Sequence, residues 1–175
     1  LPGAYFVTIC IKNRRSLLGK IENGVCELSQ IGEIAKSCWV EIPGHFNNVG
    51  LGEYIIMPNH FHGIIFIYDN SATGQTHANK SEQVNRETTT DENNKEYIRK
   101  MHKKLSVIIG SYKSAVTKKS NRVSPITNFA WQTSFYDHII RNAEGLDYIS
   151  DYIRMNPLNW NKDLENEKYL SEINI

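Results

Sequence analysis

The chain has 175 residues, of which 40% are hydrophobic and 22% charged, and its formal net charge at pH 7 is +1. This length suits one domain with a proper core, and no apolar run approaches the roughly eighteen residues that a membrane-spanning helix needs. We therefore expect a single domain over residues 1–175, without a membrane anchor or a signal peptide. Because residue 1 is leucine, we expect the natural chain to begin before it.

Cysteine usage indicates a reducing compartment. The three cysteines, Cys10, Cys26 and Cys38, are odd in number, widely spaced and without a CxxC pair. Such a set is typical of buried free thiols, and a zinc site or a disulfide is the alternative. We expect free thiols in a cytoplasmic protein.

The N-terminal region predicts a strand followed by a hairpin. Residues 4–12 are rich in β-branched and aromatic side chains, which favours a strand, and a basic turn follows at Lys12-Asn13-Arg14-Arg15. Asn23-Gly24 is a strong turn signal. It is expected to join two short strands at residues 17–21 and 24–28.

A helix and a second long strand come next. The apolar residues between 30 and 42 fall on one helical stripe, with Ser29 as the expected N-cap. Pro43-Gly44 is expected to end this helix. Residues 49–56 then predict a strand that leads into the next stretch.

The stretch Met57-Pro58-Asn59-His60-Phe61-His62-Gly63 is the most informative part of the chain. The run that follows Asn59 is β-branched, aromatic and too short for an independent helix, so we expect a strand. Side chains alternate along a strand, which puts His60 and His62 on one face about 7 Å apart and Phe61 on the other. Two imidazoles on one face can share a metal ion, and a pair of packed polar residues is the alternative. Gly63 is expected to let a backbone or ligand approach beside the histidines.

Residues 70–96 are polar and almost without hydrophobic side chains, so we expect a flexible surface loop there.

The region after this loop is basic, and no acidic residue lies between Tyr97 and Tyr136. Two helical segments, 97–109 and 110–117, are expected within this basic region. They predict a surface for the phosphate backbone of a nucleic acid, with a solvated helix face as the alternative. The expected contacts are Arg99, Lys100, Lys103, Lys104, Lys113, Lys118, Lys119 and Arg122, with Tyr112 available for stacking.

The C-terminal third predicts an extended segment and a helix. Residues 131–140 read as a strand, and a helix with Leu146, Ile149, Ile153 and Met155 on its buried side follows from residue 143. Pro157 disfavours helical geometry at the residue before it, which places the end of the helix there. The polar tail after about residue 160 is assigned no chemistry.

Four stretches, in this order along the chain, together resemble the REP-associated tyrosine transposases, which are single-tyrosine members of the HUH endonuclease superfamily. They are Tyr5-Phe6-Val7-Thr8; Met57-Pro58-Asn59-His60-Phe61-His62-Gly63; Trp131-Gln132 with Phe135-Tyr136-Asp137-His138-Ile139-Ile140-Arg141-Asn142; and Tyr152-Ile153-Arg154-Met155-Asn156-Pro157. The resemblance covers the chain from about residue 4 to about residue 160.

The resemblance implies that Tyr152 is a nucleophile and that Asn156 joins His60 and His62 as ligands of Mg²⁺ or Mn²⁺. A phenol, with a reference pKa of about 10, reaches its anionic form more easily than a serine hydroxyl does. Attack on DNA would leave a 5′-phosphotyrosine link and a free 3′-hydroxyl. Tyr148, one turn earlier, is the alternative nucleophile, and Asn before Pro is also ordinary capping chemistry.

The resemblance also implies an α+β fold, a ferredoxin-like antiparallel sheet with the histidines on a central strand and helices on one face. The implied partner is single-stranded DNA with hairpin ends, bound by a monomer or a homodimer and cut by a sequence- and hairpin-directed transposase. One alternative is a catalytically inactive hairpin-binding protein. The other is a zinc hydrolase that uses His60, His62 and a carboxylate such as Glu53.

Overall fold

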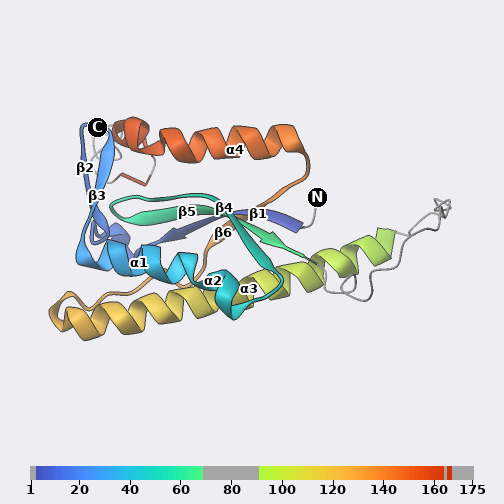
Figure 1. The fold of residues 1–175 in the computed structure, drawn as a ribbon, viewed down its shortest axis with the longest axis horizontal. Coiled ribbons are helices and arrows are strands. Elements are labelled where there is room, and N and C mark those ends of the chain that lie inside the picture. The colour runs from blue at the N-terminus through green and yellow to red at the C-terminus, as the bar shows by residue number, and fades with distance from the viewer. Residues whose placement is uncertain (1–2, 69–90, 164, 167–175) are drawn as a thin grey trace.

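In a computed structural model of the chain, which describes residues 3–68, 91–163 and 165–166, a four-stranded antiparallel sheet lies at the centre (Figure 1). Its strand order is β4 (Val49–Ile56), β5 (His60–Ile67), β1 (Gly3–Cys10) and β6 (Tyr136–Ile140). Counted along the chain, the first and third of these strands pair in the middle, as in ferredoxin-like sheets. The predicted α+β class and the central position of the histidine strand are confirmed.

Helices cover both faces of this sheet. Helix α1 (Gln30–Val40) and helix α3 (Asp91–Val123) pack on one face, whereas α4 (Ala143–Met155) packs on the other (Figure 1). The prediction of helices on one face is therefore correct for α1 and α3 and wrong for α4. The central strands carry apolar side chains on both faces of the sheet, so helices must pack on each face.

The hairpin and the first helix form largely as the sequence predicts. Strands β2 (Gly19–Glu22) and β3 (Val25–Leu28) pair through Asn23 and Gly24, whose φ angles are 51° and 74°. Two successive positive φ angles are what a tight hairpin turn requires. The hydroxyl of Ser29 accepts a hydrogen bond from the Gly32 amide at 3.1 Å and caps α1.

Two predicted helix boundaries are wrong for reasons of packing and turn chemistry. Helix α1 ends at Val40, and Pro43-Gly44, expected to stop it, instead lies inside a short helix α2 (Ile42–His45). Proline is tolerated there because the first turn of a helix has no intrahelical partner for its amide.

The two helical segments predicted at 97–109 and 110–117 are one continuous helix, α3. A side chain at Gly110 would meet nothing within 4 Å, so this glycine faces open space and breaks no contact. Its intrinsic cost of about 1 kcal/mol is offset by the burial of neighbours such as Leu105 and Ile109. The helix begins at Asp91, inside the predicted loop, and the rest of that loop lies outside the described residues. None of the described helices is both long and apolar enough to cross a bilayer.

The C-terminal elements differ from prediction at two points. The predicted strand at 131–140 is regular only in β6, and Trp131 makes an isolated bridge with Ile11. Three of the four predicted core positions of α4 pack on the sheet, but Met155 is 49% exposed. At Asn156 the chain turns from α4 into the 3₁₀ helix η4 (Asn156–Lys162). Two further 3₁₀ turns, η1 (Lys12–Arg14) and η3 (Pro125–Thr127), lie in the loops.

Candidate metal and tyrosine site

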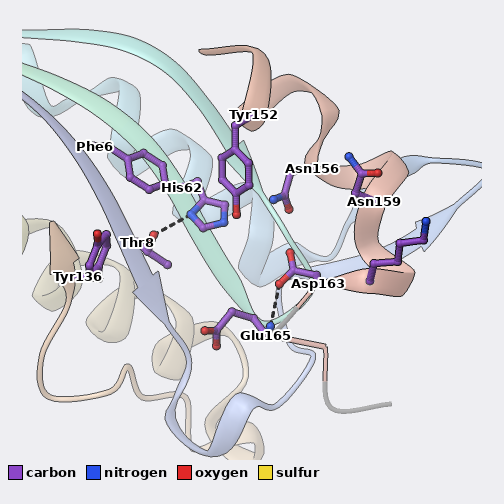
Figure 2. A pocket seen from close by; sticks show the side chains of 10 residues that line it. Phe6, Thr8, His62, Tyr136, Tyr152, Asn156, Asn159, Asp163 and Glu165 are labelled. Atoms are coloured by element: carbon purple, nitrogen blue, oxygen red, sulfur yellow. Dashed lines mark hydrogen bonds between the residues drawn. The ribbon is translucent and has the colours of Figure 1, made fainter. Parts of the chain in front are cut away.

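The candidate site begins as a row of side chains across three strands. In the sheet register His62 of β5 lies opposite Thr8 of β1, and Thr8 lies opposite Tyr136 of β6. Together with Phe6 and residues from α4, η4 and the following segment they line a pocket of about 520 Å³ (Figure 2). This pocket lies on the α4 side of the sheet. The predicted division of the strand, with His60 and His62 on one face and Phe61 in the opposite core, is borne out by these contacts.

The side-chain amide of Asn59 determines which ring nitrogen of His60 carries the proton. Asn59 donates from Nδ2 to the carbonyl oxygen of Glu165 at 2.6 Å, which turns its own Oδ1 toward Nδ1 of His60 at 2.9 Å. A carbonyl oxygen can only accept, so Nδ1 carries the proton and Nε2 keeps its lone pair. His62 has its Nδ1 atom 2.8 Å from the Thr8 hydroxyl, which can accept as well as donate. When Nδ1 donates to it, Nε2 of His62 also keeps its lone pair.

Both imidazoles are held neutral. Burial lowers the pKa of His62 to about 3, and burial together with the neighbouring His62 lowers the pKa of His60 well below its usual range. Neither Nε2 atom has a hydrogen-bond partner among the described residues, although both are buried. A buried acceptor without a partner is costly, and neutral imidazole nitrogens are the form that binds metals.

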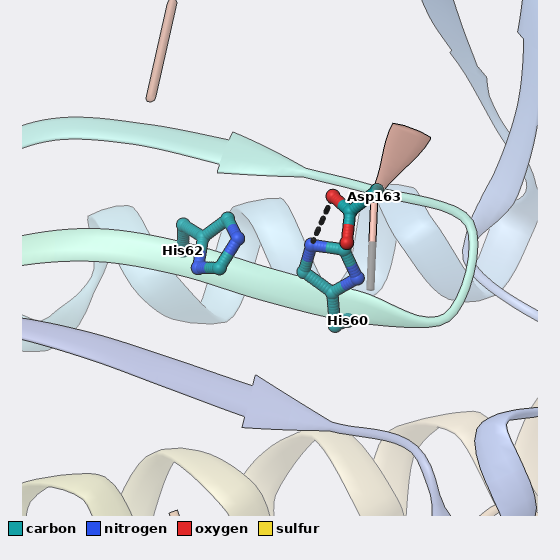
Figure 3. Close-up of side chains that lie close together, drawn as sticks. All are labelled: His60, His62 and Asp163. Carbon is teal, nitrogen blue, oxygen red and sulfur yellow. Dashed lines mark ion pairs between the residues drawn. The ribbon is translucent and has the colours of Figure 1, made fainter. Parts of the chain in front are cut away.

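Asp163 lies beside the two histidines (Figure 3). One ligand atom from each of the three residues falls within 4.8 Å of the others, and Oδ2 of Asp163 is 3.8 Å from Nε2 of His60. Two ligands that each sit about 2.1 Å from one ion are separated by roughly 3.0 Å when adjacent and roughly 4.2 Å when opposite. The spacing therefore fits a small divalent cation after shifts of tenths of an ångström.

Tyr152 stands at the mouth of the pocket on the last turn of α4. Its ring is perpendicular to Phe6, with centroids 6.0 Å apart, and lies 5.5 Å from the ring of His62 (Figure 2). The next residue, Ile153, is fully buried and fixes the helix on the sheet. Burial, and then the charge of Asp163, raises the pKa of Tyr152, while the Asn156 amide acts in the opposite direction.

Asn156 is buried between Tyr152 and Asp163. Its side-chain amide lowers the pKa of both side chains, against the larger effect of burial. Its Oδ1 has no partner among the described residues. The predicted neighbours His62, Tyr152 and Asn156 therefore meet in one pocket, with Asn156 at the turn where α4 becomes η4.

Two of the alternative residues considered from the sequence, Tyr148 and Glu53, lie elsewhere. Tyr148 is 75% exposed and does not line the pocket. Glu53 is exposed and pairs with Arg154 at 3.2 Å, away from the histidines. Cys10 does face the site, but burial and the adjacent Glu165 raise the pKa of its thiol to about 12, so it stays protonated.

Gly63 has a different role from the predicted one. A Cβ atom there would lie 2.6 Å from Cζ2 of Trp39, on the α1 face of the sheet. The missing side chain makes room for this tryptophan and not for a ligand beside the histidines.

The predicted nucleic-acid contacts on α3 lie on the far side of the sheet from the pocket (Figure 1). Tyr112, expected to stack on bases, is buried against Trp39 and Phe61, because it sits on the apolar stripe of α3. Lys113 donates to the backbone carbonyls of residues 132, 133 and 134. Lys119 pairs with Glu41. The other basic side chains expected on this helix are exposed or half-buried: Arg99, Lys100, Lys103, Lys104, Lys118 and Arg122.

Sequence reasoning missed the residues that follow α4. Asn159, Lys162, Asp163 and Glu165 line the pocket, although the tail was assigned no chemistry. Their composition is that of an ordinary polar tail. The one available signal was that Pro157, directly after Asn156, redirects the chain, which keeps the next few residues near the site.

Comparison with known proteins agrees with this architecture. A protein of Haemophilus influenzae described as uncharacterized is 34% identical over 164 residues, which span 92% of this chain and 83% of that protein. A solved structure of a REP-associated tyrosine transposase bound to a REP hairpin superposes with a TM-score of 0.51 and 18% identity, over 90% of this chain and 68% of that one. At that identity the likeness concerns the fold, and the resemblance expected from the sequence is confirmed at that level. No family model matches the chain.

Proposed function

The chain belongs to one family with the Haemophilus influenzae protein and has the fold of a REP-associated tyrosine transposase, and from this premise we propose that it is a transposase-type enzyme of single-stranded DNA. It would nick and rejoin DNA next to a hairpin through a 5′-phosphotyrosine intermediate on Tyr152. A divalent metal ion, Mg²⁺ or Mn²⁺, would be held by His60, His62 and Asn156.

One observation carries this proposal. The buried Nε2 atoms of His60 and His62 and the buried Oδ1 of Asn156 have no partner among the described residues, and a half-exposed tyrosine stands beside them. Three buried polar atoms without a partner are a poor arrangement unless a ligand such as a cation binds them. The same arrangement puts a nucleophile next to the point where a phosphate would be neutralised.

The residues of this chain have separate tasks in the proposed reaction. The Tyr152 oxygen attacks the phosphorus atom, the bond from phosphorus to the 3′ oxygen breaks, and that oxygen takes up a proton as the phenol loses one. The Asn156 amide favours the phenolate, because it acts to lower the pKa of Tyr152. Rigid packing of Ile153 holds the nucleophile in place. A bound divalent ion supplies Lewis-acid neutralisation of the phosphate, typically worth several kcal/mol.

The residues that line the pocket suit a nucleotide strand. Its walls carry the aromatic rings of Phe6 and Tyr136, the latter 60% exposed, and the ammonium group of Lys162 is available for a phosphate. Bases stack on exposed aromatic rings with little sequence preference. The exposed cations of α3 would then hold the duplex stem of a hairpin, away from the scissile bond.

The test is the covalent adduct. Purified protein is incubated with labelled single-stranded DNA that carries hairpins from its own genomic neighbourhood, in Mn²⁺ or Mg²⁺, and run on a denaturing gel. We expect a metal-dependent protein–DNA band that disappears in Tyr152→Phe, while DNA binding and the thermal unfolding midpoint stay unchanged. Tyr148→Phe, one turn earlier on the same helix, is the matched control and should keep the band.

Other outcomes point to the alternatives. Cleavage without a covalent band would replace the transposase with a metal-dependent hydrolase. A band that survives in Tyr152→Phe and is lost in Tyr148→Phe would move the nucleophile. Hairpin binding with no cleavage under any metal would indicate an inactive binding protein.

A further inference from the structure

We propose that Asp163, in the segment after η4, is a direct ligand of the metal ion at His60 and His62. This inference rests on the metal site of the proposed function and goes beyond it, because the carboxylate comes from outside the tyrosine helix. It would give the site a negative charge that two imidazoles and an amide cannot supply. Such a site binds its metal before any DNA arrives.

The contact between Asp163 and His60 is difficult to explain without a cation. Since Nδ1 of His60 donates to Asn59, its Nε2 presents a lone pair to Oδ2 of Asp163 at 3.8 Å (Figure 3). Two acceptors then face each other in a buried place with no hydrogen between them. An ion bound to both atoms turns this repulsion into attraction.

The carboxylate is held in this position by its own segment. Its Oδ1 accepts from the Glu165 amide at 2.7 Å, which leaves Oδ2 toward the histidines. The same Asn59 that orients His60 donates to the carbonyl of Glu165 at 2.6 Å. One amide thus aligns a metal-binding imidazole and the segment that carries the carboxylate, as partners around metal ligands commonly do.

Glu165 provides an internal comparison. It is a carboxylate in the same segment and lines the same pocket, but its Oε2 lies 3.4 Å from the Arg14 guanidinium and 3.5 Å from the Cys10 sulfur. Its carboxylate therefore interacts with Arg14 and Cys10, on the other side of the segment. Removing it changes the local charge by the same amount as removing Asp163, without touching the proposed ligand set.

The ligand set also bears on which metal is bound. Carboxylate oxygens favour Mg²⁺ and Mn²⁺, whereas imidazole nitrogens also suit softer ions such as Zn²⁺. A neutral set of two histidines and an asparagine would bind Mn²⁺ weakly, since affinity for hard cations rises with the charge of the ligands. Asp163 would therefore shift the site toward Mn²⁺ and raise its affinity.

The first test is Mn²⁺ binding by the full chain without DNA, measured by calorimetry and by the loss of the free-ion EPR signal. We expect Asp163→Asn to weaken binding by at least about tenfold, the lower end of what even indirect partners of metal ligands contribute. Glu165→Gln should bind within about twofold of the wild type. Equal affinity of Asp163→Asn and the wild type overturns the inference, as does a wild type that binds no Mn²⁺.

A second variant keeps the test decisive if Asp163→Asn fails to fold. Asp163→Cys and Glu165→Cys are each titrated with Co²⁺ after folding is verified by circular dichroism. A thiolate-to-cobalt charge-transfer band is expected in Asp163→Cys and absent in Glu165→Cys and in the wild type. No band in Asp163→Cys, or the same band in both variants, overturns the inference.

These measurements fail independently of the adduct assay. Wild-type adduct formation with unchanged Mn²⁺ affinity in Asp163→Asn would remove Asp163 from the metal site and leave the transposase proposal standing. Weakened Mn²⁺ binding in Asp163→Asn with no adduct in the wild type would keep Asp163 in the metal site and overturn the transposase proposal.

Discussion

The two faces of the central sheet bury similar side chains but leave different polar atoms without partners. On the α1 and α3 face the unpartnered buried atoms of the described residues are the indole N–H groups of Trp39 and Trp131 and the hydroxyls of Tyr112 and Ser120. On the α4 face they are Nε2 of two histidines and Oδ1 of an asparagine. The N–H and hydroxyl groups of the first set are hydrogen-bond donors, which do not suit a cation. Imidazole nitrogens and an amide oxygen that converge on one place are suitable ligands of a cation.

The side chains of strand β5 point alternately to the two faces of the sheet. Phe61, Gly63 and Ile65 belong to the large core beneath, and His60 and His62 belong to the site above. A substitution at one position should therefore affect folding with little effect on chemistry, and a substitution at the next should do the opposite. The following expectations test that separation.

The largest effect is expected for His62→Phe, which keeps the ring stacked on Phe6 and removes a metal ligand. Loss of metal neutralisation, worth several kcal/mol, should reduce adduct formation by at least about 100-fold. The free energy of unfolding in EDTA should change by no more than about 1 kcal/mol, because the hydrogen bond that is lost is the one to Thr8. Gel quantification and urea denaturation measure the two. A large loss of stability with activity retained would mean that the histidine is a core residue.

Gly63→Ala should show the opposite pattern. The new Cβ would lie 2.6 Å from a ring carbon of the fully buried Trp39. Overpacking of this kind costs about 1–3 kcal/mol, so the urea midpoint should fall while adduct formation under native conditions stays within about twofold.

Gly110→Ala is the matched control for that substitution. Nothing lies within 4 Å of its Cβ, and it sits in the middle of α3. Replacing a helical glycine by alanine stabilises by up to about 1 kcal/mol. Two glycine-to-alanine changes should thus have opposite signs, and equal effects would contradict the packing assigned to Gly63.

The sequence was sufficient for features that depend on local patterns. Alternation in β5 predicted which residues face the candidate metal site, and Asn23-Gly24 and Ser29 predicted a turn and a helix cap. It was insufficient where tertiary packing decides. Gly110 does not interrupt α3, because the apolar stripe on both sides is buried. Tyr112 was expected at a DNA surface on composition alone, although its place on that stripe puts it in the core.

Asp163 shows the same limit at the site itself. Its position beside the two histidines depends on Asn59, more than a hundred residues earlier in the chain, which anchors the segment through the Glu165 carbonyl. Composition carries no trace of such a contact. His60 and His62 were predictable because their relation is a strand period, and Asp163 was not because its relation to them is a tertiary hydrogen bond.

The smallest effect is expected when surface lysines are replaced. The two faces of the sheet should contact different parts of the DNA, so lysines on each face should affect different DNA. Lys100 and Lys103 are both exposed on α3. Replacing both by glutamine should reduce the slope of the logarithm of the hairpin-binding constant against the logarithm of salt concentration by about 0.9 per lost phosphate contact. The binding of unstructured single strands should stay unaffected. Lys162→Gln, at the pocket, should instead reduce the slope for single strands by about 0.7. Fluorescence anisotropy over a salt series measures both slopes. If the α3 pair weakened both kinds of DNA equally, the strand would have to cross from one face to the other, and the separation of the two faces would not extend to DNA binding.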